Sequence, residues 1–268
     1  MSLNTMASAR LGFILAAICA ACICLSPGLG FAEEKSPTIT VSEYMHPISP
    51  PDVPECDRVE DAHFARALLV GDSLSDGIGI HNVIPEMQLM TRIGLTPQSA
   101  ATEKLFKNNG KAVTLAQKLP VMRPSAVYLW LGSNGLVSKD ADQVIKEYSR
   151  LLNRLLAALP NTPFYLLEVT PVQRLSQKQY ATFTNERIDA FNTALHGLAE
   201  QHNVYVLPIN SILQDEEGYL REEYAAEDGV HLRKPAYEAI AAYLYTHALP
   251  PLETPETLEE DPEVSATP

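Results

Sequence analysis

The sequence has few basic residues and one tryptophan, and the shortage of basic residues excludes a class of partner. Lys and Arg number 20 against 33 Asp and Glu, which gives a formal net charge of −13 at pH 7. A surface so acidic repels phosphate backbones, so we expect no nucleic-acid partner. Hydrophobic residues make up 46% and charged residues 20%, which is typical of a globular protein that buries a core.

Long apolar runs are also scarce, and the longest, residues 11–25, lies near the N-terminus. It is too short to span a hydrocarbon core of about 30 Å, which favours a signal peptide over an anchor. Gly30 and Ala32 are small residues at the −3 and −1 positions of a signal peptidase site, so we expect residues 1–32 to be a signal peptide. The protein is then exported, periplasmic or secreted, with no stable membrane insertion after cleavage.

Cysteine is rare as well, and three of the four cysteines lie inside this apolar run. The mature chain would keep Cys56 as a lone thiol, without an internal disulfide. Two alternatives to cleavage stay open. One is a lipoprotein acylated at Cys22, although the usual leucine three residues earlier is replaced by Cys19. The other is an uncleaved signal anchor.

Proline and acidic residues mark the two ends of the mature chain. Residues 33–60 hold five prolines and little periodicity, which predicts an extended Pro-rich lead-in. Residues 250–268 hold five prolines and six acidic residues, so we expect a disordered tail that buries nothing. The intervening residues, 61–249, are predicted to form one folded domain.

Within that domain, short continuous apolar runs alternate with apolar residues at helical spacing. The runs predict buried strands over residues 67–70, 88–93, 126–131, 164–169 and 204–209. Helices are predicted over residues 141–159, 184–202 and after Pro235. This alternation indicates an α/β fold, a three-layer α/β/α sandwich around a five-stranded parallel sheet. Ligands bind such sheets beyond the carboxyl ends of the strands.

A candidate nucleophile follows the first of these strands. Ser73 stands in Gly71-Asp72-Ser73-Leu74, at the carboxyl end of a buried strand. One interpretation is that Asp72 or Ser73 merely caps the next helix. The G-x-S-x-G elbow of the α/β-hydrolases is not matched, because Ser75 occupies the place of its second glycine.

A serine nucleophile requires a base and a group that orients the base. His231 has Asp228 three residues before it, an offset that lets the carboxylate turn back onto Nδ1 while Nε2 faces outward. Glu60 and His63 form a weaker imitation of this spacing. Alone, His231 would be interpreted as an exposed loop histidine. With Asp228 and a strand-end serine, it is a candidate general base.

Two further residues lie at the same predicted edge of the sheet. Asn134 follows the third strand in a glycine-containing turn, where it is either a turn residue or a donor to a developing oxyanion. Gly94 follows the second strand, where a glycine allows close approach of a backbone N–H or simply makes a turn.

In order and spacing, Gly71-Asp72-Ser73-Leu74, Gly94, Gly132-x-Asn134 and Asp228-x-x-His231 resemble the four blocks of the GDSL, or SGNH, hydrolases. The resemblance implies a flavodoxin-like SGNH hydrolase fold over about residues 64–248. It implies Ser73 as nucleophile, His231 as base and Asp228 as its orienter. The oxyanion donors would be the N–H groups of Ser73 and Gly94 and the amide of Asn134. The third block departs from the usual G-x-N-D, because Gly135 replaces the aspartate.

The resemblance thus predicts an exported serine esterase or acylhydrolase. We expect small acyl or acetyl esters of envelope or environmental substrates, with glycan and lipid esters as the wider class. No cofactor and no metal are expected, since metal-ligand spacing is missing around these blocks. The alternative is a catalytically idle module that binds a glycan or an envelope partner in the same strand-end cleft.

Overall fold

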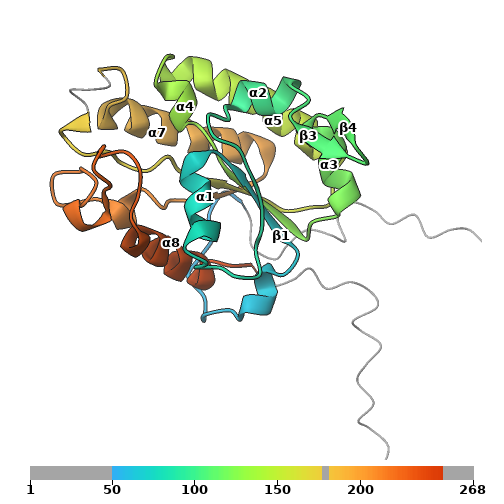
Figure 1. Ribbon diagram of the computed structural model, residues 1–268, viewed down its shortest axis with the longest axis horizontal. Helices are drawn as coiled ribbons and strands as arrows, with labels where there is room; N and C mark the ends of the chain where they lie inside the picture. The colour runs from blue at the N-terminus through green and yellow to red at the C-terminus, as the bar shows by residue number, and fades with distance from the viewer. Residues whose placement is uncertain (1–49, 177–180, 250–268) are drawn as a thin grey trace, which may run out of the picture. The chain divides into compact units, whose positions relative to one another are not determined.

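The computed structural model describes residues 50–176 and 181–249, which contain a five-stranded parallel sheet between two layers of helices (Figure 1). The strand order is β2-β1-β5-β6-β7. The strands are β1 (Ala67–Gly71), β2 (Gln88–Thr91), β5 (Ala126–Trp130), β6 (Phe164–Leu167) and β7 (Tyr205–Leu207). The predicted fold class is confirmed. The predicted signal peptide and acidic tail lie outside the described residues.

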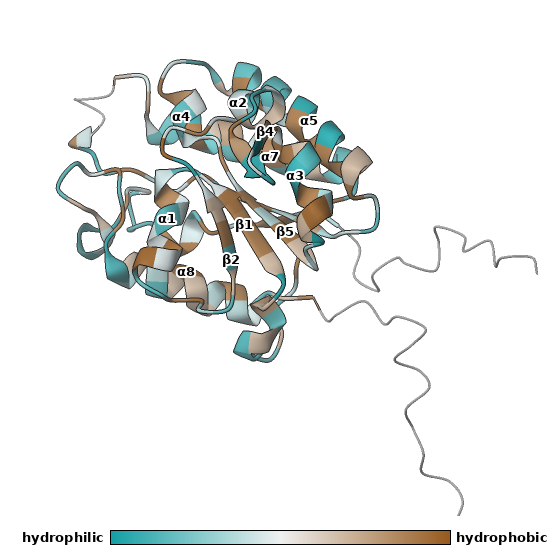
Figure 2. Ribbon diagram, turned by 45° about the vertical axis from the view of Figure 1, so that its right-hand side comes forward, coloured by the Kyte–Doolittle hydropathy of each residue, from teal (hydrophilic) through white to brown (hydrophobic). Residues whose placement is uncertain are grey.

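The helices of the described residues cover the sheet in two groups, one on each face (Figure 1). The first group is α2 (Pro97–Thr102), α3 (Leu115–Met122), α5 (Ala141–Ala158) and α7 (Asn185–His202). The second group is α1 (Ser73–Ile80) and α8 (Lys234–Thr246). Hydrophobic residues gather on the central strands, and the outward faces of the helices are hydrophilic (Figure 2).

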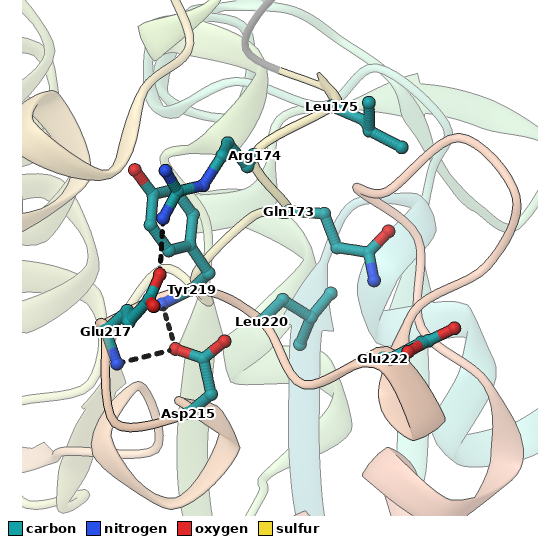
Figure 3. Close-up of a pocket in the computed structure, with 8 residues that line it drawn as sticks. All are labelled: Gln173, Arg174, Leu175, Asp215, Glu217, Tyr219, Leu220 and Glu222. Atoms are coloured by element: carbon teal, nitrogen blue, oxygen red, sulfur yellow. Dashed lines mark hydrogen bonds and ion pairs between the residues drawn. The ribbon is translucent and has the colours of Figure 1, made fainter.

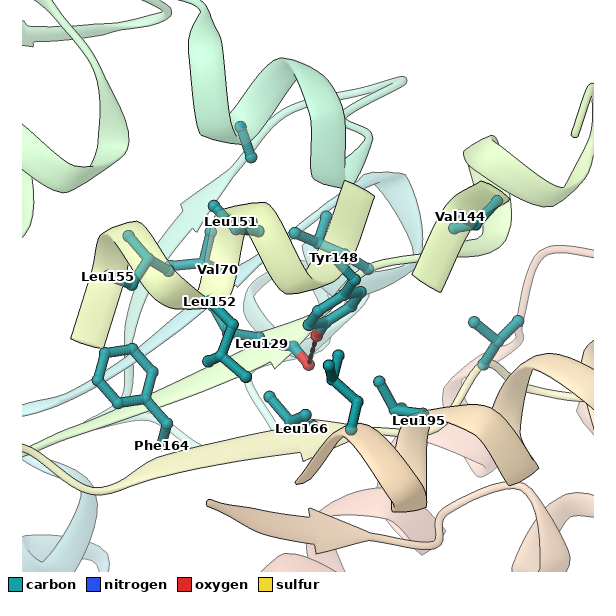
Figure 4. Packing of buried hydrophobic residues seen from close by; sticks show 14 of the residues in the cluster. Val70, Leu129, Val144, Tyr148, Leu151, Leu152, Leu155, Phe164, Leu166 and Leu195 are labelled. Atoms are coloured by element: carbon teal, nitrogen blue, oxygen red, sulfur yellow. Dashed lines mark hydrogen bonds between the residues drawn. The ribbon is translucent and has the colours of Figure 1, made fainter. Parts of the chain in front are cut away.

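Alternation along each strand sends side chains into both layers. In β1, Leu68 and Val70 face the α5 layer, whereas Leu69 faces α8. Figure 4 shows the α5 stripe of Tyr148, Leu151, Leu152 and Leu155 lying over the sheet, with the Tyr148 hydroxyl donating to the Leu129 carbonyl at 3.3 Å. Both faces of β1, β5, β6 and β7 are therefore buried, which is why these four strands are continuous apolar runs.

The predicted helices end where local chemistry stops them. Asp140 caps α5 by accepting from the Gln143 N–H at 2.8 Å, and Pro160 follows the last turn. Thr184, predicted as the first helical residue, is instead the N-cap of α7. Four of the predicted strands extend one or two residues too far; after β5, for example, the buried apolar Leu131 continues past the end of the strand.

Several short elements carried no recognised signal in the sequence. They are the antiparallel hairpin of β3 (Phe106–Asn108) and β4 (Lys111–Val113), helix α4 (Ser133–Leu136), and the 3-10 turns at Asp61–Phe64, Ser211–Leu213 and Glu222–Tyr224. Helices α2 and α3 were also not predicted. Within the described ranges, no helix combines the length and apolar character needed to cross a membrane.

The end of the Pro-rich lead-in lies on the domain. Asp52 pairs in parallel with Val206 of β7, and the Val206 N–H donates to the Pro51 carbonyl at 2.8 Å. Val53 is buried, and the Cys56 N–H donates to the Thr246 carbonyl at 2.8 Å. Residues 51–56 therefore extend the sheet edge and tie it to α8.

Glycine at position 77 allows α1 to pack directly on α8. A Cβ atom there would lie 1.9 Å from Cζ of the buried Tyr237. We predict that Gly77→Ala lowers the free energy of unfolding by about 1–3 kcal/mol or more, because the overlap forces α1 away from α8. The matched control is Gly197→Ala on the exposed face of α7, where a Cβ meets nothing within 4 Å.

The control should raise the free energy of unfolding by about 0.5–1 kcal/mol, since alanine favours a helix over glycine. Urea unfolding of both variants measures the two effects. Equal stability of Gly77→Ala and the native protein would contradict the described packing of α1 on α8.

Candidate active site

The turn from β1 to α1 places Ser73 at the carboxyl edge of the sheet. Asp72 is the N-cap of α1, and its Oδ1 accepts from the Leu74 N–H at 3.0 Å. Gly71 is required just before it, because a Cβ there would lie 1.7 Å from the Ser75 Oγ and 2.7 Å from the Trp130 carbonyl oxygen. Asp72 thus performs the capping role, which leaves the Ser73 hydroxyl for another partner.

That partner is His231, on the loop before α8. The Ser73 Oγ lies 3.1 Å from His231 Nε2, and His231 Nδ1 lies 2.6 Å from Asp228 Oδ2. Because a carboxylate only accepts, Nδ1 carries the proton and Nε2 is free to accept from the serine hydroxyl. The structure therefore brings together the three residues that the sequence singled out, in the order of a nucleophile, a base and an orienting carboxylate.

The Asp228 loop is held by its own backbone. Asp228 Oδ1 accepts from the N–H groups of Val230 at 3.0 Å and His231 at 2.9 Å, and Gly229 adopts φ +69°. Partial burial alone would raise the pKa of the Asp228 carboxyl. The hydrogen bonds from the His231 ring and the two N–H groups outweigh it, so the pKa lies below its ordinary value. Asp228 is therefore ionised at neutral pH.

Asn134 lies on α4, which begins after β5 with Gly132 at φ +139°. A Cβ at Gly132 would lie 2.8 Å from both Phe191 and Val169, so the turn accommodates only glycine. The Asn134 Nδ2 donates to Asp72 Oδ2 at 2.7 Å, and the Ser133 hydroxyl donates to the same oxygen at 2.5 Å. Two strand-end loops therefore meet at one buried carboxylate.

The Asp72 carboxyl is only 1% exposed. Burial raises its pKa above the ordinary value, while the hydrogen bonds from Ser133, the Leu74 N–H and Asn134, together with the charge of His231, act in the opposite direction. From its place in the sequence, Asp72 is expected only to cap the helix. Its contact with Ser133 and Asn134 depends on how two loops meet, and no local pattern reports it.

A cavity of about 260 Å³ opens beside Ser73. Its lining combines the polar groups of the site with apolar walls: Ser73, Leu74, Ser133, Asn134, Val137, Phe183, Val230 and His231. The apolar residues Val137 and Phe183 lie on loops without periodicity, so no sequence pattern marks them as part of the site. Gly94 adopts φ +74° but is not one of the lining residues, and its role as an oxyanion donor stays a prediction.

A larger cavity, of about 390 Å³, lies between residues 173–175 and residues 215–222 and is shown in Figure 3. Arg174 lies over the Tyr219 ring there and forms an ion pair with Glu217. Its wall joins the site through Gln173, whose N–H donates to the Gly229 carbonyl at 2.9 Å. The eight residues that line it contain no serine, cysteine or histidine, so the smaller cavity is the candidate for chemistry.

Packing explains why position 135 is glycine, where the third block of the family usually has aspartate. A Cβ there would lie 3.0 Å from both methyl carbons of Val144 on α5, so an aspartate would be pressed into the core. The turn remains held by backbone, with the Lys139 N–H donating to the Gly135 carbonyl at 3.0 Å. Across the described ranges, no group of three or more His, Cys, Asp and Glu is placed to hold a metal ion. The expected absence of metal and cofactor stays a prediction.

Comparison with known proteins gives a family match and several structural matches. The model of the GDSL-like lipase/acylhydrolase family matches residues 69–239. No curated protein matches the sequence. Each of the three structures described next is less than 25% identical to this chain, so their likeness concerns the fold.

A protein from Streptococcus pneumonia, provisionally named a platelet activating factor, is 22% identical with a TM-score of 0.56, over 67% of this chain and 81% of its own. A GDSL-like lipase from Bacteroides thetaiotaomicron is 13% identical with a TM-score of 0.53, and the match covers 70% of this chain and 88% of the lipase. A family 3 carbohydrate esterase from Clostridium thermocellum is 19% identical with a TM-score of 0.51, and the match covers 68% of this chain and 93% of the esterase.

The lowered pKa of Asp228 gives a testable dependence of stability on pH. A carboxyl whose pKa is lower in the folded state stabilises the fold above its unfolded pKa of about 3.9, and this contribution disappears as pH falls through the folded value. We predict that native protein is more stable than Asp228→Asn at pH 6. The difference should shrink as the pH falls below about 4.

Urea unfolding from pH 3 to pH 6 measures this difference. Asp215→Asn is a useful control, because Asp215 also accepts from two backbone N–H groups but faces no histidine ring. A stability difference for Asp228→Asn that stays constant over this range would contradict the inferred state of the carboxyl.

Proposed function

The chain belongs to the GDSL-like lipase/acylhydrolase family, a family of ester hydrolases, and on that premise we propose that it is an exported serine esterase acting on carboxylic esters of small acyl groups. One observation carries the proposal. The Ser73 Oγ lies 3.1 Å from His231 Nε2, and that ring is oriented by Asp228 at 2.6 Å. A serine hydroxyl becomes a nucleophile when a base so oriented accepts its proton.

The mechanism follows from these contacts. His231 Nε2 takes the hydroxyl proton as Ser73 Oγ attacks the ester carbonyl, and the resulting imidazolium is stabilised by Asp228. The imidazolium then gives the proton to the leaving alcohol as the carbon–oxygen bond breaks. Water repeats the sequence on the acyl-enzyme, releasing the acid and restoring Ser73.

The developing oxyanion requires donors already in place. Ser73 is the first residue of α1, where backbone N–H groups have no partner inside the helix. Asn134 lines the same cavity with its amide. We assign these two groups as donors and propose the Gly94 N–H as the third, as the family resemblance implies.

The shape of the cavity supports a short acyl group. Its volume of about 260 Å³ is enclosed by the apolar side chains of Leu74, Val137, Phe183 and Val230 beside the polar groups that would act on the ester. Such walls favour an apolar acyl chain, and Phe183, 2% exposed, is a bulky, well-packed part of the wall. The predicted signal peptide over residues 1–32 would deliver this activity to envelope or environmental esters.

Removal of the nucleophile tests the proposal. Ser73→Ala should lower kcat for p-nitrophenyl acetate by about 10³-fold or more, because no other group forms the acyl-enzyme. Ser75→Ala is the matched control: this buried serine, two residues on, donates to the Trp130 carbonyl and does not face the cavity. Purified mature protein is assayed with thermal unfolding recorded in parallel.

If Ser73→Ala retains a turnover within tenfold of the native value, the assignment of Ser73 as the nucleophile is overturned. A native protein that hydrolyses no ester, while binding a glycan or envelope component, would support the idle module instead.

Val137 gives a second test, because it lines the cavity and is 41% exposed, outside the buried core. We predict that Val137→Ala raises the ratio of kcat/KM for p-nitrophenyl butyrate over acetate, and that Val137→Phe lowers it, each by about threefold to tenfold. Val121→Ala, at an exposed position on α3, is the control. Ratios that stay unchanged in both Val137 variants would show that the acyl group binds elsewhere.

A further inference from the structure

We propose that Ser133 is a positioning residue of this esterase: its hydroxyl holds the Asp72 carboxylate, and Asp72 in turn orients the Asn134 amide toward the reacting carbonyl oxygen. The inference rests on the proposed function of the site. Ser133 is not one of the residues that the sequence singled out, and it would not touch the substrate's reacting atoms in this role. It acts through two neighbours.

The first observation that supports this proposal is the set of hydrogen bonds to the Asp72 carboxylate. The carboxylate is 1% exposed, and three donors satisfy it. Oδ1 accepts from the Leu74 N–H at 3.0 Å, while Oδ2 accepts from the Ser133 hydroxyl at 2.5 Å and from Asn134 Nδ2 at 2.7 Å. A buried carboxylate without such donors would be strongly destabilising. The three contacts are therefore interdependent.

The chemistry of the amide carries the second step. Asn134 Nδ2 has two hydrogens, and one is committed to Asp72. The second hydrogen lies in the same amide plane and remains available to a substrate oxygen. A flipped amide would instead place Oδ1 against the carboxylate, where two acceptors repel. An ionised Asp72 therefore selects the amide orientation that supplies an oxyanion donor.

Ser133 is one of the three donors that favour the ionised form of Asp72. Burial raises the Asp72 pKa, and the Ser133 hydrogen bond is the first of the contacts that oppose it. Two ionisable groups interact with this carboxyl: His231, whose charge favours the ionised form, and Tyr237 of α8. Burial raises the pKa of Tyr237, and the charges of Asp72 and Asp76 raise it further. Without Ser133, a protonated Asp72 would tolerate the flipped amide.

The local sequence explains why a serine performs this role here. Gly135 provides no side chain, and packing against Val144 leaves no room for one. On α4, the polar side chains are those of Ser133 and Asn134, and both contact Asp72. The orientation of the amide thus depends on a pair of adjacent residues and one carboxylate.

A double-mutant cycle tests the proposal. Native protein, Ser133→Ala, Asn134→Ala and the double variant are assayed on p-nitrophenyl acetate, with Ser75→Ala as the control for loss of a buried hydroxyl. Asn134→Ala should lower kcat by about 10²-fold or more, the usual effect of removing an oxyanion donor. Ser133→Ala should lower kcat by about tenfold, with KM changed less than twofold, because the donor is misplaced only in the transition state.

In the Asn134→Ala background, the same Ser133→Ala change should alter kcat less than twofold, because the group through which it acts is gone. An equal loss in both backgrounds would show a merely structural role and overturn the proposal. So would a Ser133→Ala variant with the native kcat.

A second readout needs no substrate. The side-chain amide signals of Asn134, assigned by their loss in Asn134→Ala, should show slowly exchanging, well-separated hydrogens in native protein. In Ser133→Ala they should exchange faster and move closer together. Unchanged amide signals overturn the positioning role even if the esterase is active. If the amide signals change but the native protein hydrolyses no ester, the positioning role of Ser133 is supported and the proposed esterase function is wrong.

Discussion

The buried carboxylate of Asp72 constrains the whole site, because it must find its donors in two different loops. One turn joins β1 to α1, which begins with Ser73, and the other joins β5 to α4, which carries Asn134. A carboxylate that is 1% exposed is stable only when both loops close on it. Nucleophile and amide are thereby fixed to each other. The packing of α1 on α8, through Gly77 and Tyr237, then brings the histidine loop to the same edge.

Much of the fold was predictable because burial leaves a pattern in the sequence. Strands covered on both faces are apolar throughout, and α5 displays its buried stripe at helical spacing. The β3–β4 hairpin could not be found in this way, since its short strands are partly exposed and include Lys107 and Lys111. The pairing of Asp52 with Val206 joins residues far apart in sequence, which no local pattern reports.

In the candidate site, too, some residues could be predicted from local sequence patterns and others could not. Asp228 and His231 lie three residues apart on one loop, so their contact was inferred from spacing, and Ser73 from its place after a strand. The geometry brings these three side chains into contact in the order that was predicted. The Ser133–Asp72 contact and the Val144 side chain packed on Gly135 arise from tertiary packing alone. These two contacts could be identified only from the three-dimensional arrangement of the loops.

The central claim is that Ser73 carries the acyl group during ester cleavage. Its most direct test is mass spectrometry of the purified protein, quenched in acid within milliseconds of mixing with p-nitrophenyl acetate, followed by peptide mapping. If Ser73 is the nucleophile, its peptide should show a transient mass increase of one acetyl group, which is absent from samples quenched after the substrate is exhausted. Acetyl found on another residue, with Ser73 unmodified while product is formed at the steady rate, would contradict it.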